Sequence, residues 1–468
     1  MKSGRLKTFY LTLTWVLALP AWSADHALEG HRYQIRVAES LQYVEVTGHL
    51  REPLDTVRAR NGDAKRLDDL QTCDGMPLQS RGSRIYLSAG QQCFRYRHPL
   101  GVDAGRRSIG LADDVSLTSP SRWLWLPELA GDDFVQVELT LAAGQVASVP
   151  WPQSADGSYR IGASPRSSRA VAVFGRFRAP RLAVGGAQLT VALVDSLEVA
   201  LDEHKTLAWL DAALSGVSEL YGRLPNPDVQ IIVVPSGRAG RSRSPVPFGH
   251  VIRDGGETVQ FFVDADQPLA NYLRDWTADH EFAHLLLPYV DGEQKWISEG
   301  FASYYQNVLR ARRGAYTEQQ AWQRLHRSFT SARQTPNAPS PNGTGTRPFW
   351  EVRMMIYWSG AAIALLADQR LRLVSNGVVS LDTVLGRLQA CCLPSSTVWQ
   401  GRALFEKLDA LSPIPVFIDL YEEYADMPGM PDLTALYAQL GIRIEKGQVE
   451  LDDQAPFAHI RRAIMKSD

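Results

Sequence analysis

The chain has 468 residues, of which 45% are hydrophobic and 21% charged, and its net charge is −2. This length predicts two or three domains rather than a single core, and the composition is that of a globular protein, not of a disordered or fibrous one. The slightly acidic balance gives no electrostatic reason to expect nucleic acid as a partner.

The first residues predict an export signal. A start with three basic side chains precedes an apolar run at residues 9–19, and Ala21 and Ser23 place small residues where a signal peptidase cuts. Residues 1–23 are therefore expected to be a signal peptide that sends the protein to the periplasm or outside the cell. The apolar run is too short to span a bilayer comfortably, although an uncleaved anchor helix is the alternative. Cleavage changes the net charge to −5, and we expect no stable membrane span in the mature protein.

Residues 24–198 predict a β-rich N-terminal domain. Short alternating runs, separated by clusters of Gly, Asp, Pro and Ser, favour an antiparallel β-sandwich or saddle. The runs lie at 33–37, 43–46, 134–139 and 188–193. In an oxidising compartment Cys73 and Cys93 predict a disulfide within this half. The adjacent Cys391 and Cys392 leave open whether they bond to each other.

The pattern changes near residue 200, after which helices and buried strands alternate. Helical spacing runs over 203–222, a buried strand follows at 229–234, and a hairpin covers 249–263. The next helix is expected to open with Asp266 as its cap and to end before Pro288. Two more are expected at about 296–312 and 349–375, and residues 378–468 read as mostly helical.

The motif His280-Glu281-Phe282-Ala283-His284 lies on the helix expected to end before Pro288. Residues four apart share a helix face, so both imidazoles can bind a single ion, and zinc is the metal expected. Zinc lowers the pKa of water, and Glu281 stands beside the ligands as the general base that takes the water's proton. An amphipathic helix with two core histidines is the plainer reading of the same five residues.

A catalytic zinc needs a third protein ligand, and Glu299 follows His284 with fourteen residues between them. At the start of the next helix this carboxylate can face back toward the histidines. The plainer reading is that Glu299 favours its helix N-terminus through the macrodipole.

Together with HExxH, the segment Trp-Ile-Ser-Glu-Gly-Phe-Ala at 296–302 resembles the gluzincin metallopeptidases, particularly the large zinc aminopeptidases and the glycyl aminopeptidases. The resemblance implies one Zn²⁺ bound by His280, His284 and Glu299. Residues 357–361, Tyr-Trp-Ser-Gly-Ala, look like the family segment whose tyrosine stabilises the oxyanion, which makes Tyr357 that donor. An ordinary buried helix tyrosine is the alternative for Tyr357.

The sequence departs from this family in three places. The interval between His284 and Glu299 is shorter than usual, and Ser359 stands where the family usually has lysine. No Gly-Ala-Met-Glu-Asn segment, whose glutamate grips the substrate amino group, precedes the motif. The comparable region, residues 248–252, has no acid at the matching place, and the nearby Asp254 and Glu257 lie at the hairpin turn. Three arginines between 236 and 247 suit a substrate carboxylate or form a solvated loop.

We therefore expect an α+β multidomain protein with an N-terminal β-sandwich-like domain, a thermolysin-like α/β catalytic domain at 199–377 and a C-terminal helical region at 378–468. The expected function is that of an exported zinc peptidase, aminopeptidase-like, acting on a peptide or protein substrate. An endopeptidase or another amide hydrolase with the same zinc site is one alternative. A non-catalytic envelope binding protein is the other, and the oligomeric state is left open.

Overall fold

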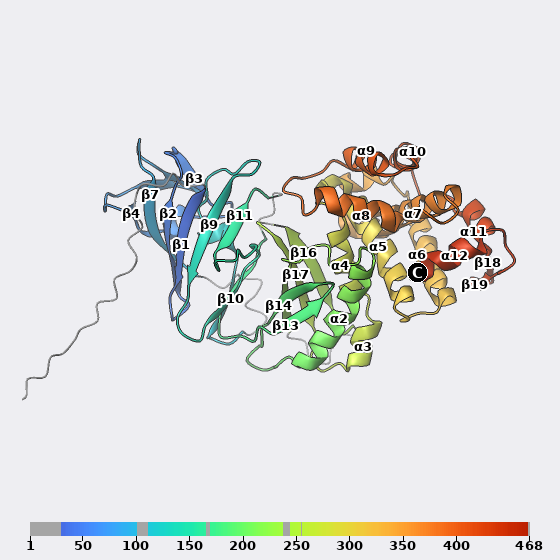
Figure 1. Cartoon of the computed structure of the whole chain (residues 1–468), viewed down its shortest axis with the longest axis horizontal. Coiled ribbons are helices and arrows are strands. Elements are labelled where there is room, and N and C mark those ends of the chain that lie inside the picture. The colour runs from blue at the N-terminus through green and yellow to red at the C-terminus, as the bar shows by residue number, and fades with distance from the viewer. Residues whose placement is uncertain (1–29, 101–110, 165–168, 237–243, 254, 467–468) are drawn as a thin grey trace, which may run out of the picture.

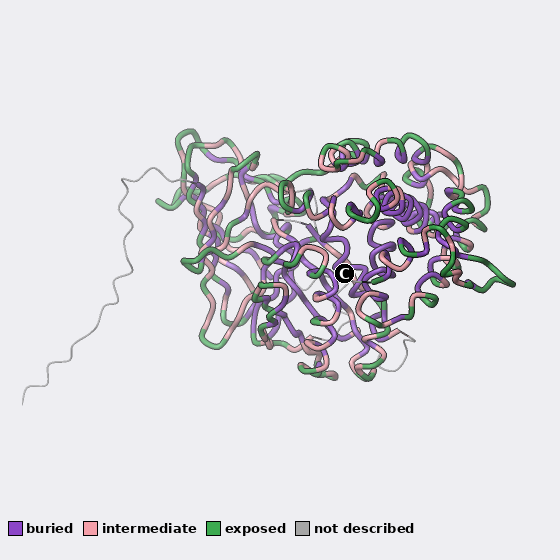
Figure 2. Tube along the Cα trace, turned by 45° about the vertical axis from the view of Figure 1, so that its right-hand side comes forward, coloured by how far each residue is buried: buried purple, intermediate pink, exposed green. Residues whose placement is uncertain are grey.

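The computed structural model describes residues 30–100, 111–164, 169–236, 244–253 and 255–466 (Figure 1). A β-rich part at the N-terminal end is followed by a second part, in which a sheet lies between the N-terminal strands and a group of helices. Buried residues run through the interior of both parts, and exposed residues lie on the outer loops (Figure 2). The expected signal peptide, the arginine loop at 237–243 and Asp254 lie outside the described residues.

The largest N-terminal sheet has six strands. Their order is β11 (Tyr159–Gly162), β9 (Phe134–Thr140), β1 (His31–Val37), β2 (Tyr43–His49), β7 (Cys93–Pro99) and β4 (Asp68–Thr72). Strand β1 pairs antiparallel with β2 but parallel with β9, so the sheet is mixed rather than purely antiparallel as expected. The strands predicted at 33–37, 43–46 and 134–139 are confirmed, because their alternate side chains enter the core.

Two three-stranded sheets complete the described N-terminal part. One has the order β3 (Thr56–Arg58), β6 (Arg84–Tyr86), β5 (Gln79–Arg81), and the other β10 (Val146–Ser148), β12 (Ala172–Gly175), β8 (Val115–Thr118). A short helix, α1 (Pro120–Trp123), follows β8. The second sheet contributes Leu117 and Val173 to a cluster that also contains Ile232 and Val234 of the next part. These apolar contacts join the two parts of the molecule.

A five-stranded sheet forms the base of the second part. Its order is β13 (Arg181–Val184), β14 (Ala187–Leu193), β15 (Gln230–Pro235), β17 (Glu257–Val263) and β16 (Phe248–Arg253). The three middle strands are parallel, whereas β16 is an antiparallel edge strand, which confirms the predicted hairpin. Strands β13 and β14 belong to this sheet although they precede residue 199, and the domain boundaries themselves stay a prediction.

Helices α2 (Glu203–Glu219), α3 (Leu269–Arg274) and α4 (Thr277–Ala283) pack into the same core as this sheet. The prediction of one continuous helix from Asp266 to Pro288 was wrong, because two separate helices cover this range. Asp275 is extended at ψ 151°, and its carboxylate accepts hydrogen bonds from the Thr277 amide and the Ser244 hydroxyl, each at 2.8 Å. Asp275 is the C-cap of α3, and α4 starts after Trp276. The N-cap position of α3 is held by Pro268, not Asp266.

The long helices of the second part follow. They are α5 (Lys295–Arg312), α6 (Glu318–Arg333) and α7 (Phe349–Val374), and the predicted ends of α5 and α7 are confirmed within two residues. The C-terminal region contains α8 (Leu381–Cys392), α9 (Gly401–Leu411), α10 (Phe417–Tyr424), α11 (Thr434–Leu440) and α12 (Ala458–Met465). It also forms a hairpin of β18 (Ile442–Glu445) and β19 (Gln448–Leu451), which the helical pattern did not predict. Among the described helices, none has both the length and the apolar character to cross a membrane.

Candidate metal centre

The two histidines of the motif and Glu299 lie together. Their ligand atoms are all within 4.8 Å of one another, with Nε2 of His280 3.1 Å and Nε2 of His284 3.6 Å from Oε2 of Glu299. Helix α4 supplies His280, the following 3-10 turn supplies His284, and the first turns of α5 supply Glu299. Both histidines are less than 10% exposed. Two imidazoles and one carboxylate that converge in this way are a ligand set that fits a catalytic zinc.

The second ring nitrogen of each histidine has its own partner. Nδ1 of His280 donates to Oε1 of Gln306 at 2.9 Å, and Nδ1 of His284 lies 2.9 Å from Oγ of Ser298. These contacts leave both Nε2 atoms facing Glu299, the orientation in which they bind a metal. Neither partner was predicted. Gln306 lies seven residues after Glu299, two turns along the same face of α5, and that spacing is the signal that could have found it.

The charges of Glu299 and the two imidazoles stabilise one another and shift the pKa values of these groups. Burial opposes ionisation of Glu299, but the two imidazoles outweigh it and hold the pKa of this carboxyl well below its usual range. Burial also lowers the pKa of His280, yet the hydrogen bond to Glu299 and the charge of Glu281 raise it overall. Without metal the cluster therefore binds a proton tightly. A divalent cation satisfies the same carboxylate and takes the proton's place.

Glu281 lies beside the three ligand residues rather than among them. It is 7% exposed, and its Cγ is 2.8 Å from where a Cβ on Gly249 of the edge strand β16 would stand. Burial raises the pKa of this carboxyl, and the two neighbouring imidazoles oppose the rise. A carboxylate with a raised pKa next to the metal ligands is suited to accept a proton from water.

Tyr357 reaches the site from α7. Its ring centroid is 5.7 Å from that of His280. Burial and the charges of Glu299 and Glu281 raise the pKa of the phenol, so it stays protonated and can donate. Ser359 does not reach the site, because it is fully buried and its hydroxyl donates to the Met355 carbonyl at 2.5 Å.

Glu257 is not available to bind a substrate. Its side chain accepts from Nε of Arg253 at 2.6 Å and from Nδ2 of Asn226 at 2.8 Å, and it is 7% exposed. Arg253 also donates to the carbonyls of His284 and Leu287 at 2.7 and 3.1 Å. The pair therefore holds the chain just after the metal-binding helix, and it does not face a substrate amino group.

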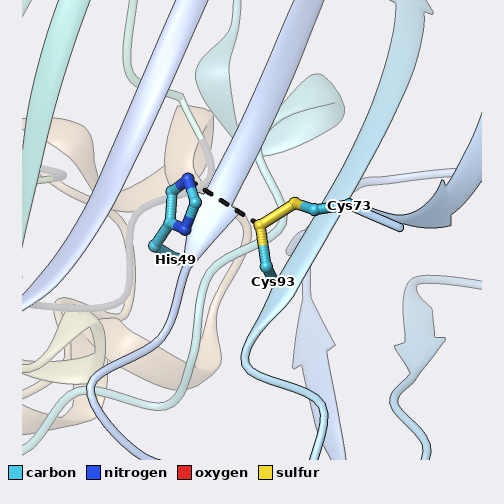
Figure 3. A group of neighbouring side chains, drawn as sticks. All are labelled: His49, Cys73 and Cys93. Carbon is cyan, nitrogen blue, oxygen red and sulfur yellow. Dashed lines mark hydrogen bonds between the residues drawn. A yellow bond between two sulfur atoms is a disulfide. The ribbon is translucent and has the colours of Figure 1, made fainter. Parts of the chain in front are cut away.

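A second group with metal-ligand geometry, His49, Cys73 and Cys93, is of a different kind. The predicted Cys73–Cys93 disulfide is present, and Nε2 of His49 lies 3.7 Å from the Cys93 sulfur (Figure 3). Disulfide sulfurs are not thiolate ligands, so this group does not fit a metal. Cys391 and Cys392 also form a disulfide with each other, a pairing that the sequence left open.

Comparisons with known proteins agree with this geometry. Residues 289–342 match the family model of M61 glycyl aminopeptidase, a segment that contains Glu299 and begins after His284. The fold resembles an aminopeptidase N family protein from Idiomarina loihiensis with a TM-score of 0.61 and 16% identity, over 91% of this chain and 80% of that one. No curated protein sequence matches the chain.

Two solved structures of an M1 zinc metallopeptidase from Deinococcus radiodurans are also similar. One has a TM-score of 0.51 and 14% identity over 86% of this chain and 94% of that one. The other, a mutant bound to a Tyr-Ser-Ala substrate, has a TM-score of 0.50 and 14% identity over 86% and 95%. The expected resemblance is confirmed. The fold resembles that of M1 zinc metallopeptidases, and His280, His284 and Glu299 form a group of residues that can hold a metal ion.

Proposed function

We propose that the protein is a zinc-dependent peptidase, and the convergence of His280, His284 and Glu299 on one point is the observation that carries this proposal. A bound zinc ion supplies Lewis acidity to the substrate carbonyl and lowers the pKa of water. The three ligand residues hold the ion, and Gln306 and Ser298 keep the imidazoles turned toward it.

The remaining chemistry falls to two side chains next to the ligands. Glu281 accepts the proton of the attacking water and passes it to the leaving amine. Tyr357 donates a hydrogen bond to the carbonyl oxygen as negative charge develops on it, which is worth most in a site that excludes water. Glu281 lies close to Gly249 of β16, and the Tyr357 ring lies 5.7 Å from that of His280.

Aminopeptidase-like cleavage is the first candidate for substrate choice. It is supported by the match to the glycyl aminopeptidase model and by the similar enzyme solved with a tripeptide. A specific observation favours the second candidate, an endopeptidase or other amide hydrolase. Glu257, an acid beside the hairpin turn, is paired with Arg253 and cannot bind a free amino group. The three ligand residues and Glu281 are all present, which argues against a non-catalytic binding protein.

Export to the periplasm or beyond is part of the same proposal. Its support is the amino-terminal sequence of residues 1–23 and the presence of two disulfides, Cys73–Cys93 and Cys391–Cys392. Disulfides persist in oxidising compartments and are rare in the cytosol of mesophiles. Amino-terminal sequencing of the protein recovered from a periplasmic extract tests this, and a mature chain that still begins at Met1 in the cytosol contradicts it.

The test of the activity pairs zinc content with hydrolysis of two quenched peptide sets, one with free and one with blocked N-termini. Glu281→Gln should keep stoichiometric zinc and lose cleavage, whereas His284→Ala should lose both. Cleavage of free peptides alone supports an aminopeptidase, and cleavage of blocked peptides supports an endopeptidase. Equal zinc and equal activity in wild type and His284→Ala would refute the proposal.

A further inference from the structure

Trp276 is an exposed tryptophan at the N-cap of α4, the helix that contains His280. Trp276, His280 and His284 follow one another at intervals of four residues, so they share one face. The Trp276 and His280 ring centroids are 5.4 Å apart in an edge-to-face arrangement. Trp276 is nevertheless 45% exposed, which is unusual for so large an apolar side chain in direct contact with a metal ligand.

Helix α7 presents a second row with the same spacing. Phe349, Arg353 and Tyr357 are again four residues apart, and the Phe349 ring centroid is 6.4 Å from that of Tyr357. Phe349 is 48% exposed. Since the rings of Tyr357 and His280 are 5.7 Å apart, the four aromatic rings form one continuous line with an exposed aromatic residue at each end.

Arg353 adds a charge to this line. It is exposed, forms no ion pair or hydrogen bond within the described part of the chain, and lies close enough to act on the Tyr357 phenol electrostatically. A positive charge at this place disfavours lysine and arginine side chains of a substrate and tolerates uncharged or acidic ones. The apolar surface of Trp276 and Phe349 favours aromatic and large aliphatic side chains.

We propose that Trp276 and Phe349 form the specificity surface of the site, and that they bind an aromatic or large aliphatic side chain next to the scissile bond while Arg353 excludes basic ones. This inference rests on the proposed peptidase function and names its substrate class. The occupant is the substrate itself, because the surface is continuous with His280 and Tyr357.

The test uses the zinc-loaded full chain and peptides that differ only at the residues flanking the cleaved bond, with phenylalanine, leucine, glycine or lysine there. We expect kcat/KM to be at least ~10-fold higher for phenylalanine than for glycine, and lowest for lysine. Trp276→Leu and Phe349→Ala should lower kcat/KM far more for phenylalanine than for glycine peptides, and Arg353→Ala should raise it for lysine. Tyr86→Ala, which removes an aromatic side chain 40% exposed on β6, is the matched control.

Two results overturn the inference: equal kcat/KM for phenylalanine and glycine peptides, or variants that lower both equally at unchanged zinc content. If the zinc-loaded protein cleaves no peptide, the proposed activity fails, and calorimetry with phenylalanine and glycine hydroxamates then decides the specificity surface separately. Tighter binding of the phenylalanine compound that is lost in Phe349→Ala supports the surface. Equal or absent binding of the two compounds refutes it.

Discussion

Gly300 of α5 and Gly360 of α7 contact each other through their backbones where the two helices cross. A Cβ added at Gly300 would lie 2.3 Å from Cα of Gly360, and one added at Gly360 would lie 2.0 Å from the carbonyl oxygen of Trp296. Gly300 follows the ligand Glu299, and Gly360 lies one turn after Tyr357. The close crossing therefore brings the tyrosine of one helix against the carboxylate of the other.

Gly300→Ala and Gly360→Ala should each destabilise the protein by about 1–3 kcal/mol or more, because backbone atoms cannot yield as a flexible side chain can. Zinc affinity and kcat should fall with stability, since α7 must move away from Glu299. Urea unfolding and zinc titration measure both effects. The control is Gly216→Ala inside α2, whose added Cβ meets nothing closer than 3.7 Å and which should stabilise the helix by about 1 kcal/mol. Equal behaviour of Gly300→Ala and this control would contradict the tight crossing.

Removing the partners of the ligand histidines should weaken zinc binding without removing a ligand. We expect Gln306→Leu and Ser298→Ala to lower zinc affinity about 10–100-fold, because the imidazoles lose the hydrogen bonds that orient them. Competition with a chromogenic chelator measures the change. Ser303→Ala is the control on the same helix, since the buried Ser303 hydroxyl has no hydrogen-bond partner within the described residues. An unchanged affinity in Gln306→Leu would show that His280 needs no such support.

The Tyr357→Phe variant should retain zinc but hydrolyse peptides more slowly. The variant keeps the ring beside His280 but removes the only hydroxyl that can donate to the developing oxyanion from α7. By comparison with other oxyanion donors we expect kcat to fall about 100–1,000-fold with little change in KM. Steady-state kinetics with zinc analysis check this. A matching loss of zinc would instead assign Tyr357 a role in holding Glu299.

The buried Arg253–Glu257 pair should be structural. Arg253→Ala leaves Glu257 unpaired and frees the carbonyls of His284 and Leu287, so we expect a loss of about 3–5 kcal/mol in the free energy of unfolding. Arg402→Ala, which breaks exposed pairs with Glu406 and Glu422, should cost about 0–1 kcal/mol and serves as the control. Chemical denaturation measures the free energy of unfolding of both variants and of the wild type. If Arg253→Ala instead changed only KM for peptides with free N-termini, Glu257 would be the missing amine anchor.

Much of the metal centre follows from the sequence. His280 and His284 are four residues apart on a helix, and that interval alone places both imidazoles on one face. Glu299 was found because it begins the next helix within a recognisable segment, and Tyr357 because its own segment resembles that of known peptidases. The long helices α5 and α7 were also predictable, since their apolar spacing repeats over many turns.

The tertiary structure alone decided other features. Asp275 divides the expected single helix because its carboxylate binds both Thr277 and Ser244, a residue far away along the chain. Strands β13 and β14 join the second sheet through the parallel pairing of β14 with β15, which no local pattern encodes.

The sequence by itself thus indicated which residues can hold zinc, because the spacing of His280 and His284 is a local property and Glu299 lies in a recognisable segment. Only the fold decided what surrounds them: Gln306 behind His280, Arg253 on Glu257, and the Tyr357 ring of α7 beside His280. Each of these contacts joins separate elements, and periodicity within one element carries no information about which side chains another element will bring to it.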